Sequence, residues 1–423
     1  MDGLPGAGGP HIEPAGVPFE GVIRGCFLFT GERLIPRGGV QIRAGRVAAI
    51  LGSGEADPAG GEILDLPRAL VHPGLLNAHA HLDLSGLEGR IPPGLPFPDW
   101  LSRVRCLRAE AGEAGLTDRA RAGIRELVAS GSTAVVDWSY GGHSEAPLRE
   151  SGLRSVILWE VIGPWPQRAS AAAAAARDWL AARTPGAGIV HGLAPHSPYL
   201  ATGDLIRECK RLVGMGPFSI HAAELIAEEE FLRHGTGPLR GFLLGVGVPP
   251  EAIGPVMMGP VGLLDRLGVL YGALVIHGNF LGAEDIEILR RRRAAVVFCP
   301  RSHTYFGRPP HPLPDLLAAG VPVALGTDSS ASNCGLSMAE EMREVRRQLP
   351  ALGAREIFDL GTGVLAARHL PWIPGPGLEP GVRADLAAAD VDGGQGDPLE
   401  AFLRPGSRAV LTMADGRKLF SVD

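Results

Sequence analysis

The sequence lacks the features of a secreted, membrane-spanning or nucleic-acid-binding protein. Its five cysteines are an odd number, widely spaced and without a CxxC pair, which argues against a disulfide scaffold and a cysteine zinc site. No apolar run reaches 18 residues, and the first residues have neither a basic nor an apolar signal region. The net charge of −6, with dispersed Lys and Arg, gives little support to a polyanion surface. We therefore expect a soluble cytoplasmic protein with neither nucleic acid nor membrane as a partner.

Several catalytic signatures are also missing. The sequence contains no HExxH, no Walker A loop, and no HxE with PCxxC, which is the signature of one zinc deaminase architecture. These absences argue against zincin proteolysis, phosphoryl transfer and that deaminase type.

The composition favours a large folded core. The chain has 423 residues, of which 45% are hydrophobic and 20% charged, so wholesale disorder is excluded. We predict a mobile Gly/Pro-rich arm over 1–18, a central domain over 71–377, and one small β-sandwich formed by 19–70 together with 378–423.

The central domain alternates strand-like apolar runs with helical stretches rich in Ala, Leu, Arg and Glu. Such alternation predicts βα units, and eight of them predict an α/β fold of the (β/α)8 TIM barrel type. The eight expected strands are Leu70–Leu82, Thr133–Trp138, Ser155–Val161, Ile189–His196, Phe218–Glu224, Leu274–Asn279, Ala295–Pro300 and Val321–Asp328.

Metal-ligating residue types lie at the ends of these runs. His79 and His81 are two residues apart, so in a strand both imidazoles face the same side, although a pair of buried core histidines would look the same. His221, His277 and Asp328 end three later strands, and a barrel directs such ends into one mouth. Nitrogen ligands with one carboxylate suit zinc or ferrous iron better than magnesium or calcium.

The segments PGLLNAHAHLDLS, APHSPYL, IHAAE, VIHGNF, CPRSH and LGTDSSASN occur in this order along nearly the whole barrel. In these segments the chain resembles the amidohydrolase superfamily, in particular its cytosine deaminase, chlorohydrolase and nucleoside deaminase branch. The resemblance implies a hydrolase in which one divalent ion, zinc or alternatively iron, activates water. Its ligands would be His79, His81, His221 and Asp328, with Asp328 also serving as the base.

By the same resemblance, His277 contacts the water or the substrate, and Glu224 is the proton shuttle. Alternatively, Glu224 is an acid in the first turn of a helix that interacts favourably with the helix macrodipole. This role is also open to Glu228 or Glu229. Binuclear members carry a lysine at the end of the fourth strand, and this sequence has LAPHSP there, so we expect one ion.

The substrate is a small molecule whose identity is less firmly indicated. The candidate contacts are His196, Arg301, Ser302, His303 and Trp100, although helix capping, surface ion pairing, solvent exposure or packing would also explain the last four. Segments such as HLDLS and EVIGP are similar to aminofutalosine deaminases of the alternative menaquinone route, which implies an adenine ring. Hydrolysis of another C–N or C–Cl bond of a cyclic substrate is the alternative. A non-enzymatic scaffold protein is disfavoured, because such a protein would be expected to lose metal ligands of the family and this sequence keeps all of them. A homodimer is the expected oligomer.

Overall fold

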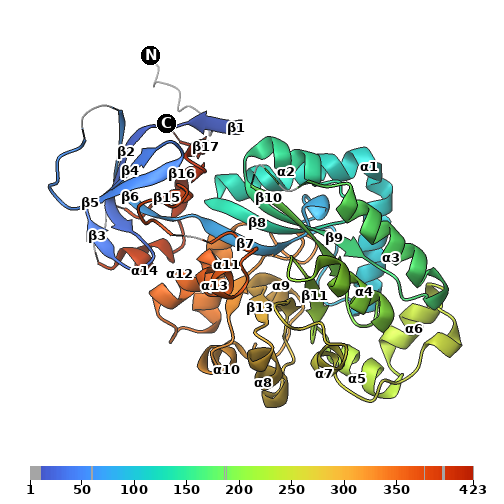
Figure 1. Ribbon diagram of the computed structural model, residues 1–423. Helices are drawn as coiled ribbons and strands as arrows, with labels where there is room; N and C mark the ends of the chain where they lie inside the picture. The colour runs from blue at the N-terminus through green and yellow to red at the C-terminus, as the bar shows by residue number, and fades with distance from the viewer. Residues whose placement is uncertain are drawn as a thin grey trace, which may run out of the picture.

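The computed structural model describes residues 11–58, 61–184, 186, 188–375, 377–392 and 396–422 (Figure 1). Eight parallel strands surround the barrel axis in two hydrogen-bonded halves, which confirms the predicted (β/α)8 barrel. One half has the order β10-β9-β8-β7 and the other β11-β12-β13-β14. These strands are β7 (Leu75–Ala80), β8 (Ser132–Ser139), β9 (Arg154–Val161), β10 (Ile189–Pro195), β11 (Ser219–Ala222), β12 (Leu274–His277), β13 (Ala295–Phe298) and β14 (Val323–Leu325).

Helices cover the outside of the barrel, apart from the last one, which lies beside the strands of the two chain ends (Figure 1). Among the described residues they are α1 (Phe97–Ala129), α2 (Glu145–Ser151), α3 (Pro166–Ala181), α4 (Gly203–Val213), α5 (Ile226–His234), α6 (Pro238–Gly245), α7 (Pro260–Arg266), α8 (Ala283–Arg291), α9 (Pro300–Tyr305), α10 (Leu313–Ala318), α11 (Met338–Gln348), α12 (Ala354–Thr362), α13 (Val364–His369) and α14 (Pro398–Phe402), with single 3-10 turns η1 (Leu82–Leu84) and η2 (Pro250–Ala252). In the described part of the chain, none of them combines the length and apolar character that crossing a bilayer requires.

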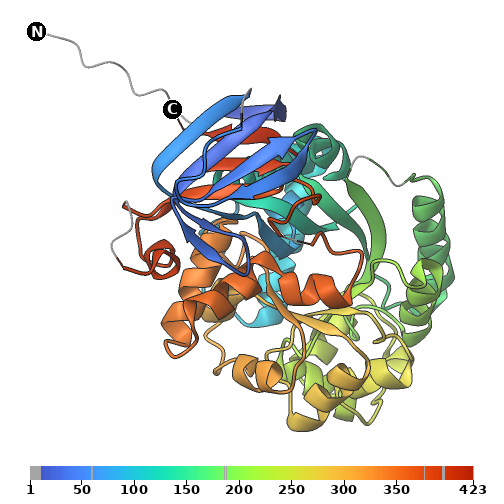
Figure 2. The same cartoon turned by 60° about the vertical axis from the view of Figure 1, so that its left-hand side comes forward.

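Strands from the two ends of the chain share a second, nine-stranded sheet. Figure 2 shows the blue N-terminal strands beside the red C-terminal ones, and β6 pairs both with β2 and with β15. Its order is β1-β17-β16-β15-β6-β2-β4-β5, with β3 paired to β2. These strands are β1 (His11–Pro18), β2 (Gly21–Phe29), β3 (Leu34–Pro36), β4 (Gly39–Arg43), β5 (Arg46–Leu51), β6 (Glu62–Pro73), β15 (Leu386–Asp390), β16 (Arg408–Ala414) and β17 (Arg417–Ser421).

Two details differ from the sequence prediction. Residues 11–18 of the predicted arm form β1 against β17, while residues 1–10 lie outside the described residues. An edge strand tolerates the prolines that suggested an arm, because one side of it needs no partner. The predicted first barrel strand is divided at Gly74 between β6 and β7, where a Cβ would come within 2.0 Å of Thr133 Oγ1.

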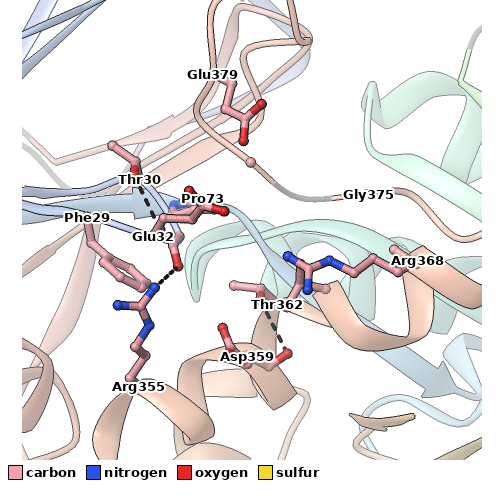
Figure 3. A pocket seen from close by; sticks show the side chains of 14 residues that line it. Phe29, Thr30, Glu32, Pro73, Arg355, Asp359, Thr362, Arg368, Gly375 and Glu379 are labelled. Atoms are coloured by element: carbon pink, nitrogen blue, oxygen red, sulfur yellow. Dashed lines mark hydrogen bonds between the residues drawn. The ribbon is translucent and has the colours of Figure 1, made fainter.

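A cavity of about 410 Å³ lies between the nine-stranded sheet and helices α12 and α13. Figure 3 shows Glu379 and Arg368 on its wall, and Arg355 donates to the carbonyl oxygen of Gly31 at 3.2 Å. The cavity also touches Pro73, which precedes β7. It therefore lies toward the amino end of that strand, away from the carboxyl end where the barrel's chemistry is expected.

The buried histidine of β6 predicts how stability depends on pH. His72 is 1% exposed, its Nδ1 bonds the carbonyl of Pro73 at 2.8 Å, and burial lowers its pKa to about 4. Between that value and the ordinary value of 6.5 only the unfolded chain takes up the proton, so stability falls on acidification. We expect a loss of about 2 kcal/mol from pH 7 to pH 5.

Chemical denaturation of the wild-type protein and of His72→Asn at both pH values measures this contribution. The loss of unfolding free energy between pH 7 and pH 5 should be smaller in His72→Asn than in the wild type. In His369→Asn, where the replaced histidine is exposed, the loss should equal that of the wild type. Equal losses in all three proteins would show that His72 does not contribute.

Candidate active site

The carboxyl ends of three barrel strands bring imidazole and carboxylate groups together. His79 lies in β7 with His81 directly after it, His221 lies in β11, and Asp328 follows β14. Nε2 of His79 is 3.2 Å from Nε2 of His221 and 3.6 Å from Oδ1 of Asp328. Nε2 of His81 is 3.7 Å from the same carboxylate oxygen. All four side chains are buried.

These distances suit a divalent ion. Two ligand atoms that are each about 2.1 Å from a tetrahedral zinc ion lie roughly 3.4 Å apart, close to the three separations above. The ligand atoms of His79, His81 and His221 all lie within 4.8 Å of one another, and so do those of His79, His277 and Asp328. The five side chains therefore enclose a space of the right size, although sequence alone did not place His277 among the ligands.

The protonation states also suit an ion. Burial, with repulsion from the neighbouring imidazoles, lowers the pKa of His81 to about 3 and holds the pKa of His221 and of His277 well below the ordinary value. Neutral imidazole is the form that binds metal. The Nδ1 atoms of His79 and His81 are buried with no hydrogen-bond partner in the described part of the chain, so no protein hydrogen bond through Nδ1 orients these two rings.

Two hydroxyl groups hold the carboxylate of Asp328. Ser302 donates to Oδ2 at 2.8 Å and Ser332 donates to the same oxygen at 3.1 Å, which leaves Oδ1 facing the histidines. Burial would raise the pKa of Asp328, but the imidazoles of His79 and His277 hold it well below its usual range. Asp328 is thus an oriented, ionised carboxylate.

The backbone is strained where it turns these side chains into the barrel mouth. His277 and Asp328 have φ angles of 73° and 60°, a left-handed conformation that costs energy in residues other than glycine and is common at active sites. The side chain of Asn77 supports the turn near Asp328 by accepting from the backbone N–H groups of His79 and Thr327, both at 3.2 Å. This contact joins the first and last strands of the barrel.

Glu224 faces the cluster from the end of β11. Its Oε1 is 3.9 Å from Nε2 of His277 and 3.6 Å from Nη2 of Arg308, and its backbone N–H donates to Glu228. Burial raises the pKa of Glu224 to about 7, against the lowering effect of Arg308. The side chain can therefore carry a proton near neutral pH. Glu228 is a first-turn acid of α5, a place that the sequence analysis allowed for it. It is fully buried and accepts the hydrogen bond from the backbone N–H of Glu224.

The five predicted substrate contacts fall into different places. The ring of His196 lies 4.7 Å from that of His221, centroid to centroid, whereas Trp100 packs against Phe97 and Phe306 and its indole N–H donates to a backbone carbonyl. A direct contact between Trp100 and a substrate stays a prediction.

The other three belong to α9. Ser302 supports Asp328, as described above. Arg301 donates to the carbonyl of Cys334 at 3.2 Å, and the ring of His303 packs against Phe298 and His311. His311 was not predicted as a site residue, because it ends no strand. Its Nε2 lies 2.9 Å from the backbone oxygen of His277.

Comparison with known proteins identifies the family of this barrel. Residues 70–418 match the model of the amidohydrolase family. The chain is 34% identical over 305 residues to aminodeoxyfutalosine deaminase of Deinococcus radiodurans, covering 68% of this chain and 70% of the relative. The chain belongs to the amidohydrolase family. It is a metal-dependent hydrolase that acts on carbon–nitrogen bonds.

Further relatives of this amidohydrolase span nearly its whole length. It is 28% identical to the 5-methylthioadenosine/S-adenosylhomocysteine deaminase of Thermococcus kodakarensis, over 94% of this chain and 93% of the relative. Among solved structures, Helicobacter pylori aminofutalosine deaminase in complex with methylthio-coformycin superposes with a TM-score of 0.77 at 19% identity, covering 94% and 100% of the two chains. A zinc-bound adenosine deaminase of Xanthomonas campestris gives 0.77 at 22% identity, covering 95% and 93%. These structures support the fold assignment.

Proposed function

We propose that this amidohydrolase is a deaminase of the adenine ring in a nucleoside-type compound. The observation that carries the proposal is the buried carboxyl of Glu224, whose pKa is raised to about 7, beside the cluster of four imidazoles and Asp328. A deaminase must protonate a ring nitrogen as water adds to the carbon bearing the amino group, and a carboxyl that is protonated near neutral pH suits this task. The names of the two curated relatives, both deaminases, support this choice.

The proposed ligands of a single divalent ion are His79, His81, His221 and Asp328. Their neutral imidazoles and single carboxylate favour zinc, with iron as the alternative. Bound there, the ion supplies the Lewis acidity that makes water a nucleophile at neutral pH.

The protein groups then have separate tasks. Oδ1 of Asp328 receives the proton of the attacking water, because its other oxygen is already occupied by Ser302 and Ser332. Glu224 gives its proton to the ring nitrogen next to the reacting carbon. It then takes the proton of the added hydroxyl group, as the carbonyl forms, and passes it to the departing amine. The proton held by Asp328 is released to solvent, and Glu224 is reprotonated before the next turnover. His277, 3.9 Å from Glu224, orients the water or stabilises the oxygen that it adds. The C–N bond breaks, and the products are ammonia and the carbonyl form of the ring.

The finer substrate proposal is an aminofutalosine-like compound, which would give the enzyme a role in menaquinone biosynthesis. His196 is the proposed contact to the substrate ring or ribose, while Arg301, His303 and Trp100 would act at the rim of the site. Ser302 would contact the substrate from its place beside Asp328. A panel of aminofutalosine, adenosine, S-adenosylhomocysteine and methylthioadenosine, followed by the change in adenine absorbance, tests the proposal. Turnover of one of these compounds is expected. No turnover of any, with hydrolysis of a cyclic amide or a chlorinated ring, would favour the alternative.

Removal of the ion should stop the reaction. Exhaustive dialysis against a chelator is expected to reduce turnover by more than about 10²-fold, because the nucleophile then loses its activation. One equivalent of zinc per chain should restore the rate, and iron is the comparison. Elemental analysis before and after dialysis gives the stoichiometry. Full activity in a preparation with less than about 0.3 equivalents of metal would contradict the proposed site.

A further inference from the structure

A buried chain of charged groups connects helix α1 to His196. Arg108 of α1 contacts Asp83 through two nitrogens, Nε at 2.7 Å and Nη2 at 3.4 Å, and its Nη1 lies 3.2 Å from Oε2 of Glu160. The other oxygen of Glu160 lies 2.7 Å from Nδ1 of His196. The guanidinium also stacks over the ring of Tyr140, 4.4 Å from its centroid. Arg108 thus joins α1 to η1, to β9 and to Tyr140, which directly follows β8.

The proposed chemistry makes no use of Arg108, Asp83 or Glu160. The side chains of Asp83 and Glu160 are each 1% exposed, and that of Arg108 is 12% exposed. Burial would raise the pKa of Glu160, but Arg108, His196 and His81 hold it well below its usual range. A buried, ionised carboxylate is costly unless each of its oxygens is paired, and here both are.

The contact with Glu160 determines which ring nitrogen of His196 carries the proton. An ionised carboxylate accepts hydrogen bonds and cannot donate one, so the proton of the imidazole must be on Nδ1, which faces Glu160. The other ring nitrogen, Nε2, is then left for a different partner. Since the ring of His196 lies 4.7 Å from that of His221, Nε2 belongs to the region of the proposed metal site.

We propose that Glu160, held in place by Arg108, is a positioning residue that orients His196 toward the heterocyclic substrate. This inference rests on the proposed function, which makes His196 a substrate contact. Because Arg108 belongs to α1, and Trp100 and Val104 of the same helix pack beneath the loop that follows β7, the position of that helix and the orientation of the substrate-binding imidazole are set together. Carboxylates that orient a functional histidine in this way are common in enzyme sites.

Glu160→Gln tests the contact with little change in shape. The amide of glutamine has only one oxygen. If that oxygen accepts a hydrogen bond from Nδ1–H of His196, the NH2 group faces the guanidinium of Arg108, and in the opposite orientation the NH2 group faces His196. We expect KM for the adenine compound to rise about tenfold, with metal content unchanged and kcat altered much less. The chain offers a matched control in Glu145 of α2, whose carboxylate lies 2.8 Å from Arg183 and 3.3 Å from Nε2 of His191. His191 belongs to β10, the strand that His196 follows. Glu145→Gln should leave KM unchanged.

A double-mutant cycle separates positioning from general support of the fold. If Glu160 acts through His196, then Glu160→Gln should change KM by less than about twofold in a protein that already carries His196→Asn. An equal effect in both backgrounds would overturn the proposal. Should Glu160→Gln fail to fold, Arg108→Lys is the second variant. Lysine keeps the positive charge but cannot contact Asp83 and Glu160 at the same time as the guanidinium does, so KM should rise here too.

A measurement without substrate distinguishes the failure of this inference from the failure of the proposed function. Nitrogen-15 NMR of the zinc-loaded protein, with the His196 signals identified by their loss in His196→Asn, should show the proton on Nδ1 in the wild type. The signals should shift in Glu160→Gln and stay in place in Glu145→Gln. A wild-type His196 with its proton on Nε2 would overturn the inference, whereas the absence of any adenine deamination with the proton on Nδ1 would count against the proposed function alone.

Discussion

Asp328→Asn is expected to lower kcat by about 10³-fold or more. The amide cannot accept the proton of the attacking water, and it is a poorer ligand for a divalent ion than a carboxylate. The substitution also leaves an NH2 group facing either the two hydroxyl donors at the present Oδ2 or the histidines at Oδ1. Both orientations disturb the cluster, so metal content should fall together with activity.

Metal analysis and turnover of Asp328→Asn should be measured on the same preparation. Asp359→Asn is a suitable control, because Asp359 is a half-buried acid of α12 that lines the cavity between the sheet and the barrel. It should retain activity. Wild-type turnover in Asp328→Asn would refute both the ligand role and the base role.

Glu224→Gln should have a different signature. The residue is 3.9 Å from His277 and holds none of the proposed ligand positions, so zinc content should be unchanged. Because glutamine cannot deliver a proton to the ring nitrogen, kcat is expected to fall about 10²-fold to 10⁴-fold. Stopped assays with long incubation times would measure the residual rate.

Helix α5, which begins two residues after Glu224, provides the comparison. Glu229 of α5 is half-buried and pairs with Arg233, so Glu229→Gln removes one carboxylate close in sequence without touching the site. Its kcat should match that of the wild type. If Glu224→Gln were equally active, the proton would have to come from another group, and Glu228 would be the first to examine.

The sequence was sufficient for the parts of the molecule that follow from strand periodicity. Eight apolar runs predicted the barrel. The polar residues at the carboxyl ends of these runs predicted a cluster, which the structure brings together, of His79, His81, His221, His277 and Asp328. The (β/α)8 topology makes this possible, because residues far apart in the chain share one mouth when each ends a parallel strand.

Groups that act through other side chains were not found from the sequence. Arg108 lies within a helix, away from any strand end. Glu160 is the last residue but one of β9, but a lone glutamate there did not indicate which side chains it would contact. The hydrogen bond from Ser302 to the carboxylate of Asp328 was not predicted either, because it depends on where the first turn of α9 places the hydroxyl. Such partners depend on contacts between distant elements, and a single sequence does not reveal them.

Because β6 pairs with β15, the nine-stranded sheet cannot be completed until nearly the whole chain has been synthesised. Strands β2 to β6 leave the ribosome first, but one edge of β6 stays open until the whole barrel has been translated and β15 arrives. Open edges of this kind invite association with other nascent chains. Loss of the last few dozen residues, for example by a premature stop codon, would therefore harm solubility even though it spares each of the proposed metal ligands.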